Sequence, residues 1–339
     1  MAEQSFPDQN KFPAAGPSSP NMPLNGTSPL NLLKGGLIIT SLILTTLVNG
    51  TTIIVMVPFK YLLQKTSFNK VLKEILFTIA RGWINFNNKV FTNLHGVEWK
   101  TVGDRVPESA GKYLLISNHL SAGDILAIFQ LTRGRLPFPR FFLKQELLFV
   151  PFFGQALWSL EMPVMKRYST HYLKRHPEKK GKDLETTKRS CKILKGQPFT
   201  FINYVEGTRF KRSKKELTGS PYQRLLKPRA GGVHMVLTQL GENLDGILNL
   251  TIFYPGHESP TISDLIFGRV RKVVLHLEFL KLDGTNASDP EKLSHRNSYQ
   301  ETRAWLNRLW AEKDQRILEL RKTHERGCRE SERSIPSNA

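Results

Sequence analysis

Hydrophobic and polar residues are distributed unevenly at the start of the chain. Residues 1–30 are rich in Pro, Ser, Asn and Gly and show little periodicity, which is typical of a tail that buries too little apolar surface to fold. Residues 35–59 then form an apolar stretch without a charge, bracketed by Lys34 and Lys60. Because about 20 apolar residues reach across the hydrocarbon of a bilayer, this stretch predicts a membrane anchor.

The residues around and within the apolar stretch predict its topology. It is followed by one acid, Glu74, and by five basic residues: Lys60, Lys65, Lys70, Lys73 and Arg81. Positive flanks stay in the cytoplasm, so the downstream domain is expected there. Asn49 and Gly50 leave open a shallow hairpin that bends at this pair and enters one leaflet. Apolar residues then recur at helical spacing up to Ile84, so residues 31–90 are predicted as the membrane anchor and an interfacial helix.

Short apolar runs and helical patterns alternate over the rest of the chain. Strands are expected at 112–117, 199–205, 248–254 and 273–280, and helices at 124–132 and 232–240. This alternation predicts an α/β fold, a twisted and largely parallel sheet flanked by helices. We assign residues 91–285 to this domain. Residues 286–339 are expected to be a helical extension, with a charged helix at about 299–326 that docks by one apolar stripe.

Charge and cysteine content narrow the classes of partner. The chain carries 49 Lys and Arg against 29 Asp and Glu, a formal net charge of +20. Its partner is therefore expected to be anionic: nucleic acid, an acidic membrane surface or a phosphorylated small molecule. The two cysteines, Cys191 and Cys328, are far apart and have no CxxC or Cys/His spacing, so neither a disulfide framework nor a metal site is predicted.

The first chemically informative segment runs from Tyr113 to Leu126, where an apolar strand ends at a histidine before a helix. His119 and Asp124 lie five positions apart and would not share a face of one helix, so they can meet only if His119 precedes it. We expect Ser121 as N-cap with Asp124 at the third helical position. Asp124 could then orient the imidazole as a general base. Asp124 as a cap and His119 as a loop residue is the alternative.

A second polar cluster follows the predicted strand at 199–205. Glu206, Gly207, Thr208 and Arg209 stand at its end, where glycine permits a tight turn and arginine can bind phosphate bidentately. A charged strand end by itself is usually only solvated. Two polar clusters at strand ends, however, are typical of ligand sites in open α/β sheets.

The pattern NHxxxxD at 118–124, followed by Glu-Gly-Thr-Arg at 206–209, resembles the glycerolipid acyltransferase family that includes 1-acylglycerol-3-phosphate acyltransferases. The match covers about 114–255, and the apolar anchor resembles that of bacterial inner-membrane members. The resemblance implies that His119 is the catalytic base and Asp124 its partner. It also implies that the strand at 251–255 lines the path of the acyl chain.

The resemblance further implies a set of substrate-binding residues: Lys144, Arg167, Glu206, Gly207, Thr208 and Arg209. Arg209 corresponds to the phosphate-binding arginine of the family. Lys144, in the segment Lys-Gln-Glu-Leu, is a candidate second phosphate ligand, and Arg167 is a weaker candidate after the segment at 162–166.

The function expected from this resemblance is acyl transfer from acyl-CoA or acyl-acyl carrier protein to the free hydroxyl of a lysophospholipid, foremost lysophosphatidic acid. No cofactor is expected beyond this co-substrate, and amides at the helix start could support the oxyanion. A phospholipid membrane is the expected partner and nucleic acid is not, with the protein at the cell inner membrane. The alternatives are another acceptor, lysophosphatidylglycerol or glycerol 3-phosphate, and a non-catalytic protein that binds anionic lipid or nucleic acid.

Overall fold

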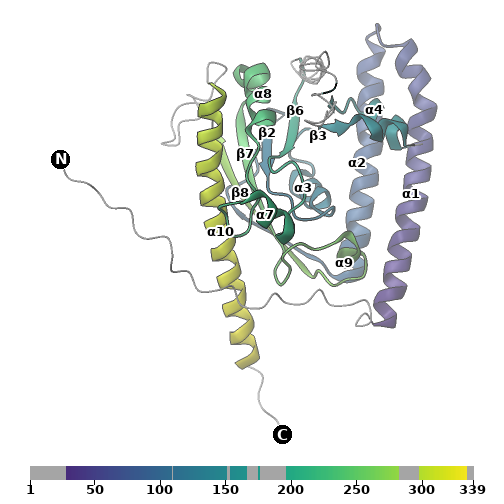
Figure 1. Ribbon diagram of the computed structural model, residues 1–339. Helices are drawn as coiled ribbons and strands as arrows, with labels where there is room; N and C mark the ends of the chain where they lie inside the picture. The colour runs from purple at the N-terminus through teal and green to yellow at the C-terminus, as the bar shows by residue number, and fades with distance from the viewer. Residues whose placement is uncertain are drawn as a thin grey trace, which may run out of the picture.

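The computed structural model describes residues 28–108, 110–150, 153–165, 175, 196–281 and 298–333. At its centre is a six-stranded sheet with the strand order β1-β8-β7-β2-β6-β3 (Figure 1). The strands are β1 (Glu98–Gly103), β2 (Lys112–Ser117), β3 (Pro139–Phe141), β6 (Phe199–Tyr204), β7 (Gly246–Phe253) and β8 (Lys272–Lys281). Neighbouring strands are parallel except β7 and β8, which are antiparallel. The carboxyl ends of β2, β6 and β7 therefore meet at one edge of the sheet.

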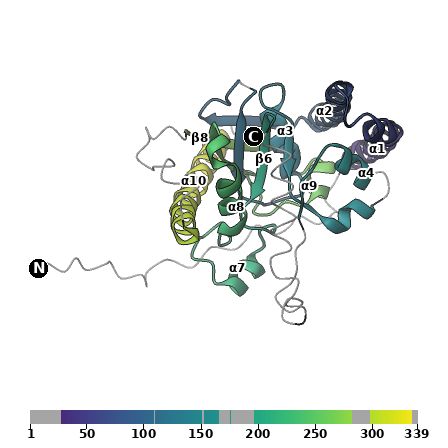
Figure 2. The same cartoon turned by 90° about the horizontal axis from the view of Figure 1, so that it is seen from above.

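Helices cover both faces of the sheet. They include α3 (Asp124–Thr132), α4 (Phe153–Ser159), α7 (Arg212–Thr218), α8 (Ala230–Leu240), α9 (Ile262–Ile266) and α10 (Tyr299–Arg333). On β2, Leu114 and Ile116 belong to the core cluster with α8 and α10, whereas Tyr113 and Leu115 belong to the cluster with α3. This alternation follows from the period of two along a strand. In Figures 1 and 2, α10 accordingly lies on one side of the sheet and the N-terminal helices on the other.

The N-terminal helices, α1 (Pro29–Leu62) and α2 (Phe68–His95), pack against each other as a hairpin. Helix α1 is long and apolar enough to cross a membrane, by length and composition. Many of its large apolar side chains are exposed, among them Leu37, Leu44 and Val48. Exposed apolar surface of this extent is typical of a face that contacts lipid or another protein.

Helix α1 contacts the rest of the protein near both of its ends. Near its start, Ile38 is fully buried, and a Cβ added to Gly35 would lie 2.3 Å from the Phe267 ring. Near its end, the Lys60 ammonium donates a hydrogen bond to the carbonyl of Ser159. Gly35 and Lys60 are separated by roughly 37 Å along the axis, at 1.5 Å per residue. The helix therefore lies along the sheet domain and does not project from it.

A buried group of charges joins the end of the hairpin to the sheet. Glu161 Oε1 lies 2.6 Å from Lys73 Nζ and 3.6 Å from Lys60 Nζ, and its Oε2 lies 3.8 Å from the Arg140 guanidinium. Burial raises the pKa of Glu161, but Lys73 and Lys60 more than offset it, so the pKa lies below its ordinary value. The three cations come from α1, α2 and β3, so one carboxylate connects all three elements.

The predicted fold class is confirmed: a largely parallel α/β sheet flanked by helices, with a long apolar helix before it. The expected strand at 112–117 and helix at 124–132 coincide with β2 and α3. The alternative of a shallow hairpin that bends at Asn49 and Gly50 is wrong, because both residues lie inside the continuous helix α1. The Asn49 amide donates to the Thr45 carbonyl at 2.7 Å, which keeps its side chain satisfied within the helix. The chain turns after Leu62 instead.

Candidate active site

Asn118 anchors the turn that follows β2. Its side-chain amide donates to the Ile252 carbonyl at 2.9 Å, and its Oδ1 accepts from the Ile252 N–H at 2.8 Å. These two bonds extend the contact between β2 and β7 beyond Ser117. Asn118 is fully buried, so His119 leaves the sheet at a well-defined point.

His119 and Asp124 meet at the carboxyl end of β2. His119 Nδ1 lies 2.8 Å from Asp124 Oδ2, which also accepts from the N–H groups of Leu120 at 2.7 Å and Ser121 at 3.0 Å. Asp124 Oδ1 accepts from the Tyr254 hydroxyl at 2.8 Å. The Asp124 side chain is fully buried, whereas that of His119 is 21% exposed. The Asp124 carboxylate can only accept a hydrogen bond from Nδ1, so Nδ1 carries the hydrogen and Nε2 is the basic atom of His119.

The start of α3 differs from the predicted capping box. The helix begins at Asp124 with Gly123 in the cap position, and Ser121 Oγ accepts from the Gly123 N–H at 3.0 Å. The prediction of Ser121 as N-cap is therefore wrong, although Asp124 does return a bond to the Ser121 N–H. The reason is that the Asp124 carboxylate accepts hydrogen bonds from the His119 imidazole and from two backbone N–H groups. The chain needs an extra turn before the helix to make these bonds. The amides of Leu120, Ser121 and Gly123 are thus used inside the turn, and the predicted oxyanion support does not come from them.

The second motif lies beside the first. The Phe210 N–H donates to the His119 carbonyl at 2.7 Å, and the Val205 N–H donates to the Ser117 carbonyl at 3.3 Å. Gly207 has φ +69°, a conformation that favours glycine and lets the chain reverse between these two bonds. The two polar clusters, about 90 positions apart in the sequence, therefore form one turn-on-turn arrangement at the sheet edge.

Basic side chains surround the second turn. Thr208 Oγ1 accepts from Lys214 Nζ at 2.6 Å. Arg229 covers Gly207, since a Cβ added there would lie 3.2 Å from Arg229 Cδ. Arg209 is exposed and forms no ion pair with the residues that the structure describes. An exposed guanidinium of this kind is suited to bind a phosphate.

Glu206 is almost fully buried at the same place. Burial raises the pKa of its carboxyl to about 8, against the opposing influence of the Leu226 and His119 amides and of Lys313. Its Oε2 accepts from the Leu226 N–H at 3.2 Å, while Oε1 has no hydrogen-bond partner of good geometry. Glu206 therefore lies inside the protein next to the His119 amide, and the exposed side chain of the motif is Arg209.

Comparison with known proteins identifies the domain that contains these turns. Residues 99–252 match the family model described as Acyltransferase. This match, which covers less than half of the chain, makes these residues similar to acyltransferases. Both motifs fall within it, and α1, α2 and α10 lie outside its bounds.

Named proteins are similar to this chain at low identity. The chain is 23% identical to mouse 1-acyl-sn-glycerol-3-phosphate acyltransferase epsilon over 254 residues, covering 68% of this chain and 63% of the relative. It is 24% identical to the human gamma protein over 213 residues, covering 59% and 51%. A solved structure of the acyltransferase PlsC from Thermotoga maritima is 16% identical, with a TM-score of 0.49, and covers 86% of this chain and 97% of that one. The chain thus spans between 51% and 63% of these two curated relatives.

Two tyrosines of the candidate site were not predicted as site residues. The Tyr204 ring stacks on the His119 imidazole with centroids 4.1 Å apart, and Tyr254 donates to Asp124. Burial and the Asp124 charge raise the pKa of both phenols well above the ordinary value, so both stay protonated. Tyr204 is the last residue of β6, two positions before Glu206, and its place at a strand end beside the second motif could have indicated it.

Lys144 and Arg167, the two predicted phosphate ligands upstream of the second motif, cannot be placed at the site from the residues that the structure describes. Lys144 lies in β4 (Leu143–Lys144), which pairs with β5 (Val164–Met165) in a separate two-stranded sheet, and its side chain is outside the described part. Arg167 lies outside the described residues altogether. Phosphate binding by Lys144 and Arg167 stays a prediction.

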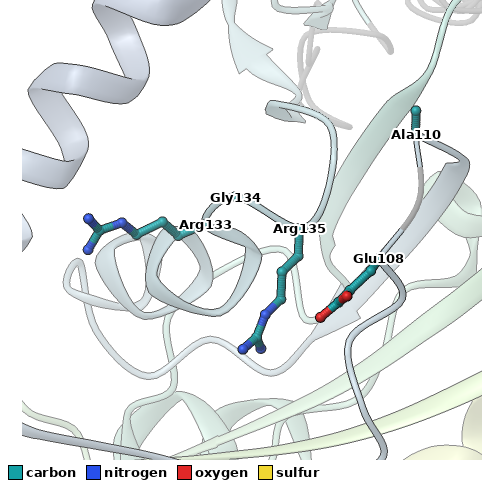
Figure 3. Close-up of a pocket in the computed structure, with 5 residues that line it drawn as sticks. All are labelled: Glu108, Ala110, Arg133, Gly134 and Arg135. Atoms are coloured by element: carbon teal, nitrogen blue, oxygen red, sulfur yellow. The ribbon is translucent and has the colours of Figure 1, made fainter.

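A hollow lies away from these turns in the described part of the chain. Figure 3 shows the hollow, which is lined by Glu108, Ala110, Arg133, Gly134 and Arg135. These residues precede β2 or follow α3, so the hollow lies at the opposite end of both elements from His119 and Asp124. In the same described ranges, no group of three or more His, Cys, Asp or Glu side chains is placed to hold a metal ion.

Proposed function

We propose that this protein transfers an acyl group from a thioester to the free hydroxyl of a lysophospholipid, with lysophosphatidic acid as the principal acceptor. The observation that carries the proposal is the 2.8 Å contact between His119 Nδ1 and the buried Asp124 carboxylate. A partly exposed imidazole oriented by a fixed carboxylate is the arrangement of a general base. The match of residues 99–252 to the Acyltransferase family model supports this chemistry.

In the proposed reaction, His119 Nε2 takes the proton of the acceptor hydroxyl while its oxygen attacks the thioester carbonyl. A carbon–oxygen bond forms, the carbon–sulfur bond breaks, and the departing thiolate takes the proton back from the imidazolium. The Asp124 carboxylate stabilises the imidazolium between these steps, and the stacked Tyr204 ring keeps the imidazole in its plane. The products are an ester and a free thiol.

Arg209 is the proposed ligand of the acceptor phosphate, with Gly207 and Thr208 shaping the turn that presents it. Arg209 is exposed and precedes Phe210, whose N–H donates to the His119 carbonyl, and this position supports the role. Lys144 and Arg167 are proposed as further phosphate ligands on the family resemblance alone. Binding the phosphate would orient the hydroxyl toward His119 and make the reaction effectively intramolecular.

The names of the relatives support a lysophospholipid acceptor and leave its head group open. They include 1-acyl-sn-glycerol-3-phosphate, lysocardiolipin and 2-acyl-1-lysophosphatidylinositol acyltransferases. Lysophosphatidylglycerol and glycerol 3-phosphate stay alternative acceptors. The donor is proposed to be acyl-CoA or acyl-acyl carrier protein.

We also propose that the α1–α2 hairpin lies in one leaflet of the membrane. Helix α1 contacts the sheet domain near both ends, through Ile38 and Lys60, and exposes apolar side chains between them. A helix that crossed the bilayer would carry one of these contacts to the far side. Placement at the inner membrane, with the domain in the cytoplasm, rests on the basic residues after the apolar stretch and stays a prediction.

The test is acyl transfer by the purified full chain in vesicles, with lysophosphatidic acid, lysophosphatidylglycerol and glycerol 3-phosphate as competing acceptors. Acyl-CoA and acyl-acyl carrier protein serve as donors. His119→Ala and Asp124→Asn should each lower kcat by about a hundredfold or more, the range of general-base catalysis. His324→Ala, on α10, is the matched control and should keep wild-type activity.

Equal activity in His119→Ala and the wild-type chain would refute the mechanism. Absence of transfer to every acceptor, together with retained binding to anionic vesicles, would favour the non-catalytic alternative. Preference among the acceptors in the wild-type chain would decide the head group.

A further inference from the structure

Two charged residues interrupt the buried stripe of α10. The stripe consists of Thr302, Trp305, Leu306, Leu309, Trp310, Lys313, Asp314 and Ile317, all of which are buried. Their spacing of three and four positions is that of one helix face packed on a core. Charged side chains are rarely buried without a specific partner, so Lys313 and Asp314 call for an explanation.

Lys313 reaches into the sheet. Its ammonium donates to the Leu250 carbonyl at 2.6 Å and lies 3.2 Å from Thr251 Oγ1, both on β7. The next residue of β7, Ile252, is the one whose backbone holds the Asn118 side chain. Lys313 therefore binds the sheet directly before the point that fixes the His119 turn.

Asp314, the neighbour of Lys313, holds the segment between α7 and α8. Its two carboxylate oxygens accept from the backbone N–H groups of Gln223 at 2.6 Å and Arg224 at 2.7 Å. Two residues later, the Leu226 N–H donates to Glu206. Two adjacent residues of α10 thus contact two different segments beside the catalytic turns. Lys313 contacts β7, and Asp314 contacts the segment that contains Gln223 and Arg224.

The two routes converge on Glu206. Its buried carboxyl bonds the Leu226 amide, lies next to the His119 amide, and interacts electrostatically with Lys313. Glu206 Oε1 lacks a hydrogen bond of good geometry. Glu278 on β8 is the second carboxylate that interacts with Lys313 from the sheet, and Asp124 also acts on Glu206.

We propose that Lys313 is a positioning residue of the catalytic site: together with Asp314 it fixes the end of β7 and the segment that holds the buried Glu206 carboxyl, so that α10 completes the acyltransferase site. The role in catalysis rests on the proposed function, whereas the coupling of Lys313 to Glu206 does not. Helix α10 follows the residues that match the family model, so the working catalytic unit extends beyond them.

Burial is consistent with this coupling. It lowers the pKa of Lys313 to about 7, and the charges of Glu278 and Glu206 oppose that change. It raises the pKa of Glu206 to about 8, against the influence of Lys313. Of the two carboxylates that act on Lys313, Glu278 has the larger influence and Glu206 the smaller.

The experiment is a double-mutant cycle on the full chain with Lys313→Met, Glu206→Gln and the combined variant. Lys322→Met, an exposed residue of α10, is the control. Chemical unfolding, which needs no substrate, is measured first, and kcat and KM for acyl transfer are measured second. If Lys313→Met does not fold, Lys313→Gln keeps an N–H donor for the Leu250 carbonyl and removes only the charge.

We expect the combined variant to lose less stability than the sum of the two single variants, because both residues belong to one set of buried contacts that joins α10 to the two turns. In the transfer assay, Lys313→Met should lower kcat about tenfold and leave KM for the acceptor within about twofold, since Arg209 is untouched. Lys322→Met should match the wild-type chain in both measurements.

Additive losses of stability would overturn the coupling. A Lys313→Met variant with wild-type kcat, or with a raised KM at unchanged kcat, would overturn the positioning role. If the wild-type chain transfers no acyl group, the proposed function fails, and the unfolding cycle still decides whether Lys313 and Glu206 are coupled.

Discussion

Tyr254 is the residue at which removal of one oxygen atom tests the dyad most directly. In Tyr254→Phe, Asp124 Oδ1 loses the donor that lies 2.8 Å away, while the ring still fills its place. A hydrogen bond to a charged group contributes about 1.5–3 kcal/mol, and we expect kcat to fall about tenfold or more with KM unchanged. Steady-state kinetics measures kcat and KM, and Tyr299→Phe, at an exposed position of α10, is the control. A wild-type kcat in Tyr254→Phe would show that the phenol does not orient Asp124.

Glu206 and Lys313 predict a pH dependence of stability with two limbs. The Glu206 pKa of about 8, raised from 4.5, means that the folded state holds an extra proton between these values, so the unfolding free energy falls as pH rises there. The Lys313 pKa of about 7, lowered from 10.5, means that the folded state lacks a proton in that range, so the unfolding free energy rises with pH.

Each limb is limited to about 1.4 kcal/mol per pH unit, and the contribution of the pair should be lowest between pH 7 and 8. Chemical unfolding at a series of pH values checks this. Glu206→Gln should remove the falling limb and Lys313→Met the rising one. Unchanged slopes in both variants would contradict the assignment.

At the scale of elements, Glu161 is the residue that holds the hairpin to the sheet. Glu161→Gln leaves Lys60, Lys73 and the nearly inaccessible Arg140 without their shared carboxylate. Removing one partner of a buried ion pair costs about 3–5 kcal/mol, and we expect faster hydrogen exchange in α1 and α2 than in the sheet. The control, Glu74→Gln, changes an exposed carboxylate 3.9 Å from Arg81 and should have little effect.

The same cluster predicts a response to acid. The pKa of Glu161 lies below its ordinary value, so its contribution is present above the ordinary carboxyl pKa and is lost as the pH falls through the folded-state value. Hydrogen exchange in α1 and α2 of the wild-type chain should therefore approach that of Glu161→Gln in acid. Protection that persists equally at all pH values would argue against an electrostatic attachment.

At the scale of the whole molecule, the proposed membrane attachment depends on the orientation of α1. We predict that both ends of α1 lie on the same side of a sealed vesicle. Leu30→Cys and Gln64→Cys, each in a Cys191→Ser, Cys328→Ser background, should react with an impermeant maleimide from that one side. Labelling of the two positions from opposite sides would show that α1 spans the bilayer.

The sequence by itself determined the features that depend on neighbours along the chain. Alternation over 112–117 predicted β2, helical spacing predicted α3 and α10, and an uncharged apolar run predicted the long helix α1. The pairing of His119 with Asp124 was also predictable, because the two residues are five positions apart and a single turn can close the distance. In each case the physical cause, a period or a short loop, is local.

Tertiary structure alone decided the features that depend on distant segments. Tyr254 meets Asp124 across 130 positions, and Lys313 meets Leu250 across 63, so no local period indicates either contact. The predicted cap at Ser121 was wrong because Asp124 bonds the imidazole and Tyr254 as well as the turn. The course of α1 along the domain is likewise set by buried contacts at Ile38 and Lys60, which an apolar run cannot encode. Long-range packing thus selects which of several locally allowed arrangements the site adopts.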